Sequence, residues 1–419
     1  MQRNVYQQMK YILIVGDGMA DYPVPELGNK TPLQVANKPN MDMVATKGRN
    51  GLLKTVPNSL TPGSGTAILS VLGYDPTRYY TGRGPFEAAA RKIKIGKNDV
   101  VYRCNTITEK DGKIVDYSAG HITSSESCQL IEALKIELEK PDYVDFFAGL
   151  GYRHFLILRD YLNDEIVEFT PPHDAIGEEI SELLPRAKTV EAKSTADMLS
   201  KMILESKEVL ENHPVNVARR NSGKRPGNLI WPWGGGKTPV MPSFREKYGV
   251  SSAVISAVDL VKGIGVYAKM KIVEVPNVTG LYDTNYEGKA DFALEALEQH
   301  DLVFVHVEAP DEAGHSKDYA LKVRTIEDLD KRLIGRLLDG LKEPCAVAVL
   351  PDHPTPIKIG THTRDPVPFA IYNPTVEGDH VKQFDEDSAK NGCAGLLEGE
   401  AFMELFLGKE AVKSQFGRT

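Results

Sequence analysis

The sequence predicts an α/β fold built on a mostly parallel sheet, and three short apolar runs carry this prediction. The runs are 10–15, 302–307 and 345–350. Each has the length of one strand and contains β-branched residues, which favours a strand with both faces covered. Helical patterns lie between strand patterns in the C-terminal part, an alternation that is typical of α/β folds.

Length, charge and cysteine placement narrow the class of protein. The 419 residues are enough for two or three domains. A net charge of −8 argues against nucleic acid as the main partner, while a local basic pocket for a small anion stays compatible with it. No apolar run reaches the roughly 18 residues that suggest a transmembrane helix, so no membrane partner is expected. The four cysteines form no CxxC pair, which favours reduced thiols and a cytoplasmic location. We expect a monomer, because no long apolar face or coiled-coil heptad is evident.

An acidic residue follows the first apolar run. The strand expected at 10–15 leads directly into the letters GDG, whose glycines allow a tight turn and the close approach of a ligand. Asp17 is then either a ligand-binding carboxylate or a turn aspartate that bonds its own backbone. A helical pattern over 31–47 is interrupted at Pro39, and 51–56 indicates another strand.

A serine flanked by glycines precedes a short apolar helix. The segment TPGSGT contains Ser64 and leads into AILSVLGYD. A helix N-terminus offers free N–H groups and the positive end of the helix dipole, which favour an alkoxide or a phosphate there. Ser64 is therefore a candidate nucleophile, and a purely structural N-cap at Ser64 or Thr66 is the alternative. The basic stretch 78–91 suits a loop near an anion.

The pattern changes beyond residue 93, which predicts a second domain. Short amphipathic strands alternate with helices over 95–225, and we interpret this region as an inserted α+β domain. The larger core domain would then comprise 1–94 and 226–419. The elements expected in the insert are strands at 100–108, 113–117, 143–150 and 153–159, and helices at 124–140, 175–184 and 194–210.

Basic and imidazole side chains recur within the insert, at His121, Arg153 and Arg219 among others. Each alone is typical of a solvated or salt-bridged surface group. A cluster of such groups would instead bind phosphate and carboxylate. The stretch 221–242 is rich in glycine and proline and holds both tryptophans, and it indicates a linker or hinge.

The C-terminal part places further carboxylates and histidines after strands. Two of them, four residues apart, follow the strand expected at 302–307, and this spacing lets both reach one metal ion. Two more follow the strand expected at 345–350, and a histidine comes nine residues later. These candidate ligands are Asp311, His315, Asp352, His353 and His362. Other expected elements are strands at 253–257, 271–275 and 369–372 and helices around Lys262, up to Leu297, over 321–338 and over 395–407.

Several strands that end in candidate ligands suggest a shared site, because a parallel sheet brings the carboxyl ends of its strands to one edge. The candidate donors are carboxylate, imidazole and hydroxyl groups without thiolate. This set suits Mn²⁺ or Zn²⁺, and Mg²⁺ less well because of the histidines. Seven ligands are too many for one ion and suit two, and two ions can activate a nucleophile and clamp a phosphoryl oxygen.

Taken together, the motifs resemble a known family. GDG, DEAGH, PDH and THTRDPVP occur in this order, together with LTPGSGTAILSVLGYDP and TGRGPFEAAAR. From Lys10 onward the chain resembles the cofactor (2,3-bisphosphoglycerate)-independent phosphoglycerate mutases of the alkaline phosphatase superfamily, in their archaeal-type branch. The resemblance implies an alkaline-phosphatase-like three-layer core with a mostly parallel sheet and an inserted α+β cap domain that closes over the substrate.

The resemblance also implies two divalent metal ions and a set of site residues. One ion would be held by Asp17, Ser64, Asp352 and His353, and the other by Asp311, His315 and His362. Ser64 would be the nucleophile that carries the phosphoryl group. His121, Arg153 and Lys262 would bind substrate, with Arg83, Arg219 and Arg245 as weaker candidates. Relatives often have an acidic or polar residue after the nucleophile, where this sequence has Gly65.

The activity implied by the resemblance is interconversion of 2-phosphoglycerate and 3-phosphoglycerate through a phosphoserine intermediate, a step of glycolysis and gluconeogenesis. The partner would be a small phosphorylated substrate. Relatives with a stretch like that at Asn221–Lys237 have also been proposed as homoserine kinases. A homoserine kinase-like enzyme, or another metal-dependent phosphotransferase or phosphohydrolase on the same core, is therefore the alternative. A metal-binding regulatory protein without turnover is an alternative of a different class.

Overall fold

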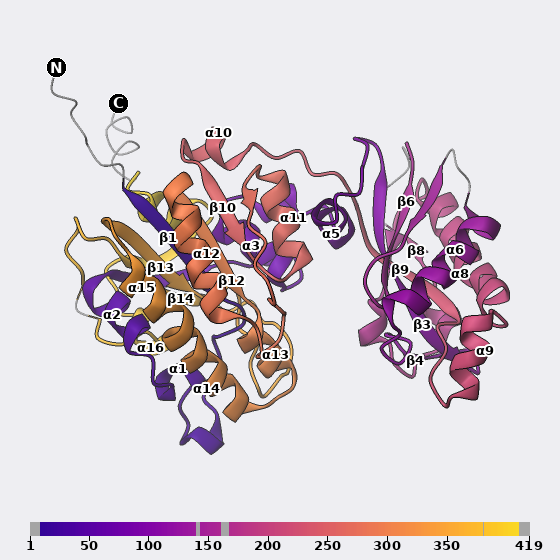
Figure 1. The fold of residues 1–419 in the computed structure, drawn as a ribbon, viewed down its shortest axis with the longest axis horizontal. Helices are drawn as coiled ribbons and strands as arrows, with labels where there is room; N and C mark the ends of the chain where they lie inside the picture. The colour runs from indigo at the N-terminus through magenta and orange to yellow at the C-terminus, as the bar shows by residue number, and fades with distance from the viewer. Residues whose placement is uncertain (1–8, 140–142, 161–166, 380, 410–419) are drawn as a thin grey trace. The chain divides into compact units, whose positions relative to one another are not determined.

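The computed structural model describes residues 9–139, 143–160, 167–379 and 381–409, which form two compact units (Figure 1). One unit comprises Met1–Tyr80 with Val240–Thr419, called the core unit below, and the other comprises 81–239, called the inserted unit. The sequence had placed the boundaries after 94 and after 225. The inserted unit extends further at both ends because α5 (Arg83–Ala90) and β9 (Leu229–Lys237) pack on β3 (Val100–Lys110).

The core unit is built on a sheet of eight strands within its described residues, in the order β11-β10-β12-β1-β13-β14-β2-β15. Strand β1 (Lys10–Gly16) lies between β12 (Leu302–Val307) and β13 (Cys345–Leu350) and is parallel to both. Among these eight described strands, only β14 runs antiparallel to its neighbours. The predicted mostly parallel sheet is confirmed. The remaining strands are β2 (Arg49–Lys54), β10 (Ser252–Ile255), β11 (Lys271–Ile272), β14 (Val367–Tyr372) and β15 (Gly395–Glu398).

Strand β1 is buried on both faces, as the continuous apolar run predicted. Residues 12–15 are all 0% exposed. Because side chains alternate along a strand, helices must cover both faces of the sheet at this point. Ile12 and Ile14 belong to a core cluster that includes side chains from α2 (Pro39–Lys47), α12 (Tyr286–Gln299) and the π-helix η3 (Leu329–Gly335). The predicted helix over 31–47 is confirmed as two helices separated before Pro39.

The helices of the core unit connect its strands. They are η1 (Pro25–Leu27), α1 (Pro32–Val35), α2 (Pro39–Lys47), α3 (Ser64–Val71), α4 (Pro76–Tyr79), α10 (Phe244–Tyr248), α11 (Asp259–Tyr267), α12 (Tyr286–Gln299), α13 (Ala309–His315), α14 (Tyr319–Asp328), η3 (Leu329–Gly335), α15 (Arg336–Gly340), α16 (Glu386–Ala389) and α17 (Ala401–Phe406).

The inserted unit is an antiparallel sheet with helices, in agreement with the α+β prediction for this region. Strand β3 is its centre, paired with β6 (Arg153–Leu158) on one side and with β9 on the other. The sheet also contains β4 (Lys113–Asp116) and β5 (Val144–Phe147), whereas β7 (Val167–Glu168) and β8 (Arg186–Ala187) form a separate two-stranded sheet. The helices besides α5 are α6 (Ser124–Leu138), η2 (Pro172–Asp174), α7 (Ile180–Leu183), α8 (Lys193–Leu210) and α9 (Pro214–Asn221).

Four sequence-based assignments differ from the structure. The expected linker at 221–242 contains strand β9, and the expected loop at 78–91 contains α5. The helix expected at 175–184 shrinks to the single turn of α7. The helix expected at 395–407 is strand β15 followed by α17, because Gly399, at φ +59, turns the chain between them.

Candidate metal centre

Three neighbouring parallel strands deliver the candidate ligands to one edge of the core sheet. Asp17 directly follows β1, and Asp352 comes two residues after β13. Asp311 lies on α13, which begins two residues after β12 ends. The order β12-β1-β13 places these three strand ends side by side, which is the edge where open α/β sheets bind ligands.

A first cluster surrounds the hydroxyl of Ser64, the first residue of α3. Its Oγ lies 3.3 Å from Asp17 Oδ2 and 3.3 Å from His353 Nε2. His353 Nε2 is also 3.4 Å from Asp352 Oδ2. The carboxylate of Asp352 accepts a hydrogen bond from the backbone N–H of Gly18 (3.2 Å). The structure thus brings together the four residues expected to hold one ion.

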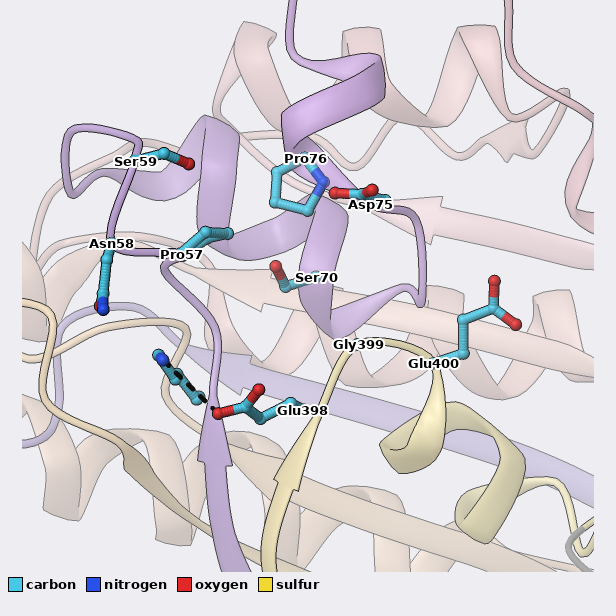
Figure 2. A pocket seen from close by; sticks show the side chains of 10 residues that line it. Pro57, Asn58, Ser59, Ser70, Asp75, Pro76, Glu398, Gly399 and Glu400 are labelled. Carbon is cyan, nitrogen blue, oxygen red and sulfur yellow. Dashed lines mark ion pairs between the residues drawn. The ribbon is translucent and has the colours of Figure 1, made fainter.

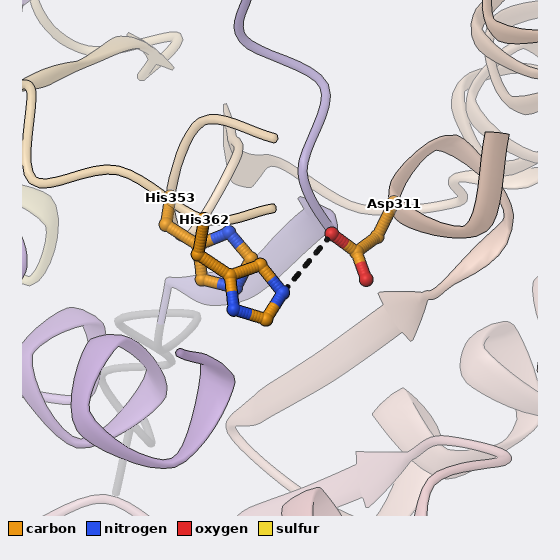
Figure 3. Close-up of side chains that lie close together, drawn as sticks. All are labelled: Asp311, His353 and His362. Atoms are coloured by element: carbon orange, nitrogen blue, oxygen red, sulfur yellow. Dashed lines mark ion pairs between the residues drawn. The ribbon is translucent and has the colours of Figure 1, made fainter. Parts of the chain in front are cut away.

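A second cluster contains Asp311, His315 and His362. The two residues of α13 are one helical turn apart, and His315 Nε2 lies 3.1 Å from Asp311 Oδ2. His362 Nε2 lies 3.5 Å from Asp311 Oδ1, the ion pair drawn in Figure 3, and 3.0 Å from His315 Nε2. The rings of His353 and His362 have their centroids 4.1 Å apart, so the two clusters adjoin.

Glycine makes the close approach of the loops possible. Gly18 has φ +63, and a Cβ there would lie 2.6 Å from Asp311 Oδ1 and 2.7 Å from Thr355 Oγ1. Gly65 follows the candidate nucleophile, and a Cβ there would clash with the ring of Tyr80. The absence of a side chain at Gly65, where relatives often carry a polar one, is thus required by local packing.

The electrostatics of the two clusters differ. Burial, together with the carboxylates of Asp352 and Asp311, raises the pKa of Asp17 well above its ordinary value. Burial also opposes ionisation of Asp311, yet hydrogen bonds from His315 and His362 hold its pKa well below the usual range. His315 has a pKa raised to about 9, because the bond to Asp311 outweighs its burial. The first cluster is therefore short of positive charge.

The side chains present fit divalent metal ions. Asp17 Oδ1 and Asp352 Oδ2 are buried and have no hydrogen-bond partner among the described residues. Such atoms are costly unless something compensates them. One group of converging ligand atoms comes from Asp311, His353 and His362, and another from Asp17, His306 and Asp352. Carboxylate and imidazole donors without thiolate are what Mn²⁺ and Zn²⁺ accept.

Three residues at this edge were missed by sequence reasoning. His306 lies inside β12 and contacts Asp17, with 3.0 Å between its Nε2 and Asp17 Oδ2. Thr355 Oγ1 donates to Asp311 Oδ1 and lies 3.3 Å from His353 Nδ1. Glu308 has a buried Oε2 without a hydrogen-bond partner in the described chain. A histidine within the apolar run LVFVHV was a usable signal, because a buried polar side chain needs a partner.

The predicted substrate-binding residues lie in different parts of the fold. Lys262 is on α11 of the core unit, and its Nζ is 2.7 Å from Glu274 Oε2. His121 and Arg153 are exposed residues of the inserted unit. Among the weaker candidates, Arg245 is exposed on α10, whereas Arg219 is 3% exposed and bonds Glu126 and backbone carbonyls, which is a structural role.

Arg153 belongs to a basic cluster of the inserted unit that the sequence did not reveal. Glu87 forms ion pairs with Arg83 and with the buried Arg103. Arg103 lies over the ring of Trp233, and its Nε has no hydrogen-bond partner among the described residues. Burial lowers the pKa of Arg103 to about 10 against the opposing effect of Glu87, with Arg83 and Arg153 contributing in the same direction as burial. Three guanidinium groups thus act around one carboxylate.

A separate depression of about 370 Å³ lies elsewhere on the core unit (Figure 2). None of the predicted ligands lines it. Its lining residues are Lys54, Pro57, Asn58, Ser59, Ser70, Asp75, Pro76, Glu398, Gly399 and Glu400.

Within the described ranges, no helix is both long and apolar enough to cross a membrane.

The fold and the site define an α/β protein with a serine hydroxyl set among carboxylate and imidazole metal donors. The family model described as 2,3-bisphosphoglycerate-independent phosphoglycerate mutase matches residues 45–216. A protein of that name from Methanosarcina mazei is 50% identical over 403 residues, which are 95% of this chain and 100% of the relative. The chain belongs to the family of 2,3-bisphosphoglycerate-independent phosphoglycerate mutases.

Solved structures agree with this assignment. The PH0037 protein from Pyrococcus horikoshii has a TM-score of 0.81 at 30% identity, and the match covers 96% of this chain and 98% of that one. The cofactor-independent phosphoglycerate mutase from Thermoplasma acidophilum has a TM-score of 0.64 at 30% identity, covering 96% and 99%. The similarity therefore extends over both units of the chain.

Proposed function

We propose that this chain interconverts 2-phosphoglycerate and 3-phosphoglycerate, with Ser64 as the residue that carries the phosphoryl group. The single observation that supports this role is the position of the Ser64 hydroxyl, between Asp17 and His353 at the start of α3. Membership of the mutase family supplies the substrate class.

The chain's own residues would act in two transfers. Ser64 Oγ forms a bond to the substrate phosphorus as the ester bond to glycerate breaks, and the proton of Ser64 ends on the freed glycerate hydroxyl. After glycerate reorients, its other hydroxyl oxygen takes the phosphoryl group from Ser64, which regains a proton. The positive end of the α3 dipole faces this exchange and favours negative charge there.

We propose that Asp17, Ser64, Asp352 and His353 hold one divalent ion and that Asp311, His315 and His362 hold a second. Bound ions would lower the pKa of the Ser64 hydroxyl and offset charge on the phosphoryl oxygens. Mn²⁺ or Zn²⁺ is favoured by the three histidines of this set. The unpartnered oxygens of Asp17 and Asp352 support the first ion most directly.

Basic residues would bind the anionic part of the substrate. Arg153, with Arg83 and Arg103, is the best supported group, because these three guanidinium groups gather near the carboxylate of Glu87 and guanidinium groups suit phosphate and carboxylate ligands. His121 of the inserted unit and Lys262 of the core unit complete the proposal. We further propose a cytoplasmic monomer without nucleic-acid or membrane partners, and the net charge of −8 supports the absence of a nucleic-acid partner.

The test is an enolase-coupled assay with 3-phosphoglycerate and Mn²⁺, without added 2,3-bisphosphoglycerate. Wild type should turn over, and Ser64→Ala should not. The matched control is Ser70→Ala, six residues further along α3 beside the depression of Figure 2. Mass spectrometry of the wild type mixed with substrate should find one added phosphoryl group on the peptide that contains Ser64. Turnover by Ser64→Ala would overturn the proposed nucleophile, and a wild type active only with ATP and homoserine would establish the kinase alternative.

A further inference from the structure

The histidine inside β12 contacts the candidate metal site at the carboxyl edge of the sheet, through Asp17. His306 is 0% exposed, and its Nε2 lies 3.0 Å from Asp17 Oδ2. An ionised carboxylate can only accept hydrogen bonds. Nε2 must therefore carry a hydrogen and donate it to Asp17 whenever Asp17 is ionised, which is the form that binds a cation.

The other side of the imidazole is also held. His306 Nδ1 lies 3.2 Å from Ser256 Oγ, and this oxygen accepts a hydrogen bond from the backbone N–H of Val258 (3.0 Å). The Ser256 hydroxyl can therefore donate its hydrogen to Nδ1. In addition, the backbone carbonyl of His306 accepts a hydrogen bond from the buried Lys289 Nζ (2.9 Å). Ring orientation and tautomer are thus both fixed by neighbours.

The hydrogen bond from His306 helps to give the two oxygens of Asp17 different partners. Oδ2 receives the His306 N–H and the hydroxyl of Ser64, which lies 3.3 Å away. Oδ1 is left buried without a hydrogen-bond partner among the described residues. A partial rotation of the carboxylate would move Oδ2 away from both His306 and Ser64. The contacts therefore leave one oxygen for a cation and keep the other on the candidate nucleophile.

We propose that His306 is a positioning residue that fixes the Asp17 carboxylate for the ion at the Ser64 side of the site. It acts through Asp17 rather than as a ligand, because Ser256 holds its Nδ1 and its Nε2 lies on Oδ2, the Asp17 oxygen shared with Ser64, rather than on the unpartnered Oδ1. Hydrogen bonds to ligating groups of this kind are worth about 10- to 100-fold in metal affinity. The inference rests on the proposed two-metal site and is independent of the phosphoryl acceptor.

The test is calorimetric titration of the metal-free full chain with Mn²⁺ alone. His306→Leu should weaken one of the two binding events by about 10- to 100-fold and leave the other unchanged. His306→Gln keeps an N–H near the position of Nε2 and should recover most of the loss. The control is His300→Leu, a histidine at the end of α12 outside the site, which should bind both ions like wild type.

Pulsed electron paramagnetic resonance of bound Mn²⁺ separates positioning from direct ligation. The number of imidazole nitrogens coupled to Mn²⁺ should be the same in wild type and His306→Gln. Loss of one coupled nitrogen in His306→Gln would overturn the inference and leave the two-metal site in place. Wild-type Mn²⁺ affinity at both sites in His306→Leu would do the same. A wild type that binds no Mn²⁺ would overturn both together.

If circular dichroism shows that His306→Leu does not fold, Ser256→Ala replaces it in the titration. This change removes only the partner of Nδ1 and leaves the imidazole in place. The same Mn²⁺ binding event should weaken by a smaller factor than in His306→Leu. Unchanged Mn²⁺ affinity at both sites in a folded Ser256→Ala protein would overturn the positioning role.

Discussion

A buried lysine joins the loop that follows β1 to the loop that follows β13. Lys322 on α14 is completely buried, and its Nζ donates hydrogen bonds to Asp21 Oδ2 (2.7 Å), to the carbonyl of Ala20 (3.2 Å) and to the carbonyl of Thr355 (2.9 Å). Replacement of Lys322 by methionine removes all three donors and leaves the Asp21 carboxylate without its cation. We expect this substitution to destabilise the core unit strongly.

The structure also bounds the size of the effect. Removing one partner of a buried ion pair costs about 3–5 kcal/mol in the free energy of unfolding. Asp21 keeps hydrogen bonds from the backbone N–H groups of Tyr22 and Ile357, so we expect the lower part of this range, about 3 kcal/mol. At a urea slope of about 3 kcal/mol per M, the unfolding midpoint should fall by about 1 M.

The assay is urea unfolding followed by far-ultraviolet circular dichroism in the presence of a chelator. The control is Arg336→Met, which breaks a pair with Asp291 in which both side chains are 50% exposed, and it should lower the unfolding midpoint much less than Lys322→Met does. Both tryptophans lie in the inserted unit, so their fluorescence follows that unit separately. A loss for Lys322→Met no greater than that of the control would refute the reasoning.

Three further predictions each concern one residue. Thr355→Val should weaken Mn²⁺ binding about 10- to 100-fold in a titration, because its hydroxyl bonds Asp311, whereas Thr355→Ser should bind like wild type. Gly65→Ala should lower mutase turnover by up to about 100-fold, because the added methyl group meets the ring of Tyr80 and displaces the neighbouring Ser64. The additional substitution Tyr80→Ala should restore part of the rate. Burial lowers the pKa of His154 from 6.5 to about 3, so the folded unit keeps it neutral while the unfolded chain binds a proton below about pH 6.5. Stability of the inserted unit should therefore fall by about 2 kcal/mol through this group between pH 7 and pH 5, as measured by tryptophan fluorescence in urea, and His154→Gln should lose this dependence.

Sequence reasoning succeeded where one local pattern determines the outcome. The apolar runs at 10–15, 302–307 and 345–350 had to be strands of a covered sheet, and three parallel neighbours had to bring Asp17 and Asp352 to one edge. The donor types are visible in the sequence, whereas the division of the ligands between two ions came from the family resemblance. The actual metal roles of these residues remain predictions that the proposed titrations test.

Prediction from the sequence failed where a residue is required by tertiary packing rather than by the local chain conformation. In β9, proline and glycine indicated a linker, yet Gly235 lies against the ring of Tyr102 and Gly236 against the carbonyl of Thr81, contacts that a Cβ would prevent. These glycines mark close packing of strands rather than freedom of the chain. Arg103 was missed for a related reason, because its partners Glu87 and Trp233 lie at a distance along the chain.

The central position of β1 has a consequence for how the chain is made on the ribosome. Both neighbours of β1 are supplied by residues after 301, and at about 5–20 residues per second the nearer one, β12, emerges roughly 15–60 s after β1. Residues 81–239 are complete well before that moment. The inserted unit can thus fold while β1 is still an unpaired apolar segment, which leaves β1 exposed to aggregation until residues 302–350 are translated.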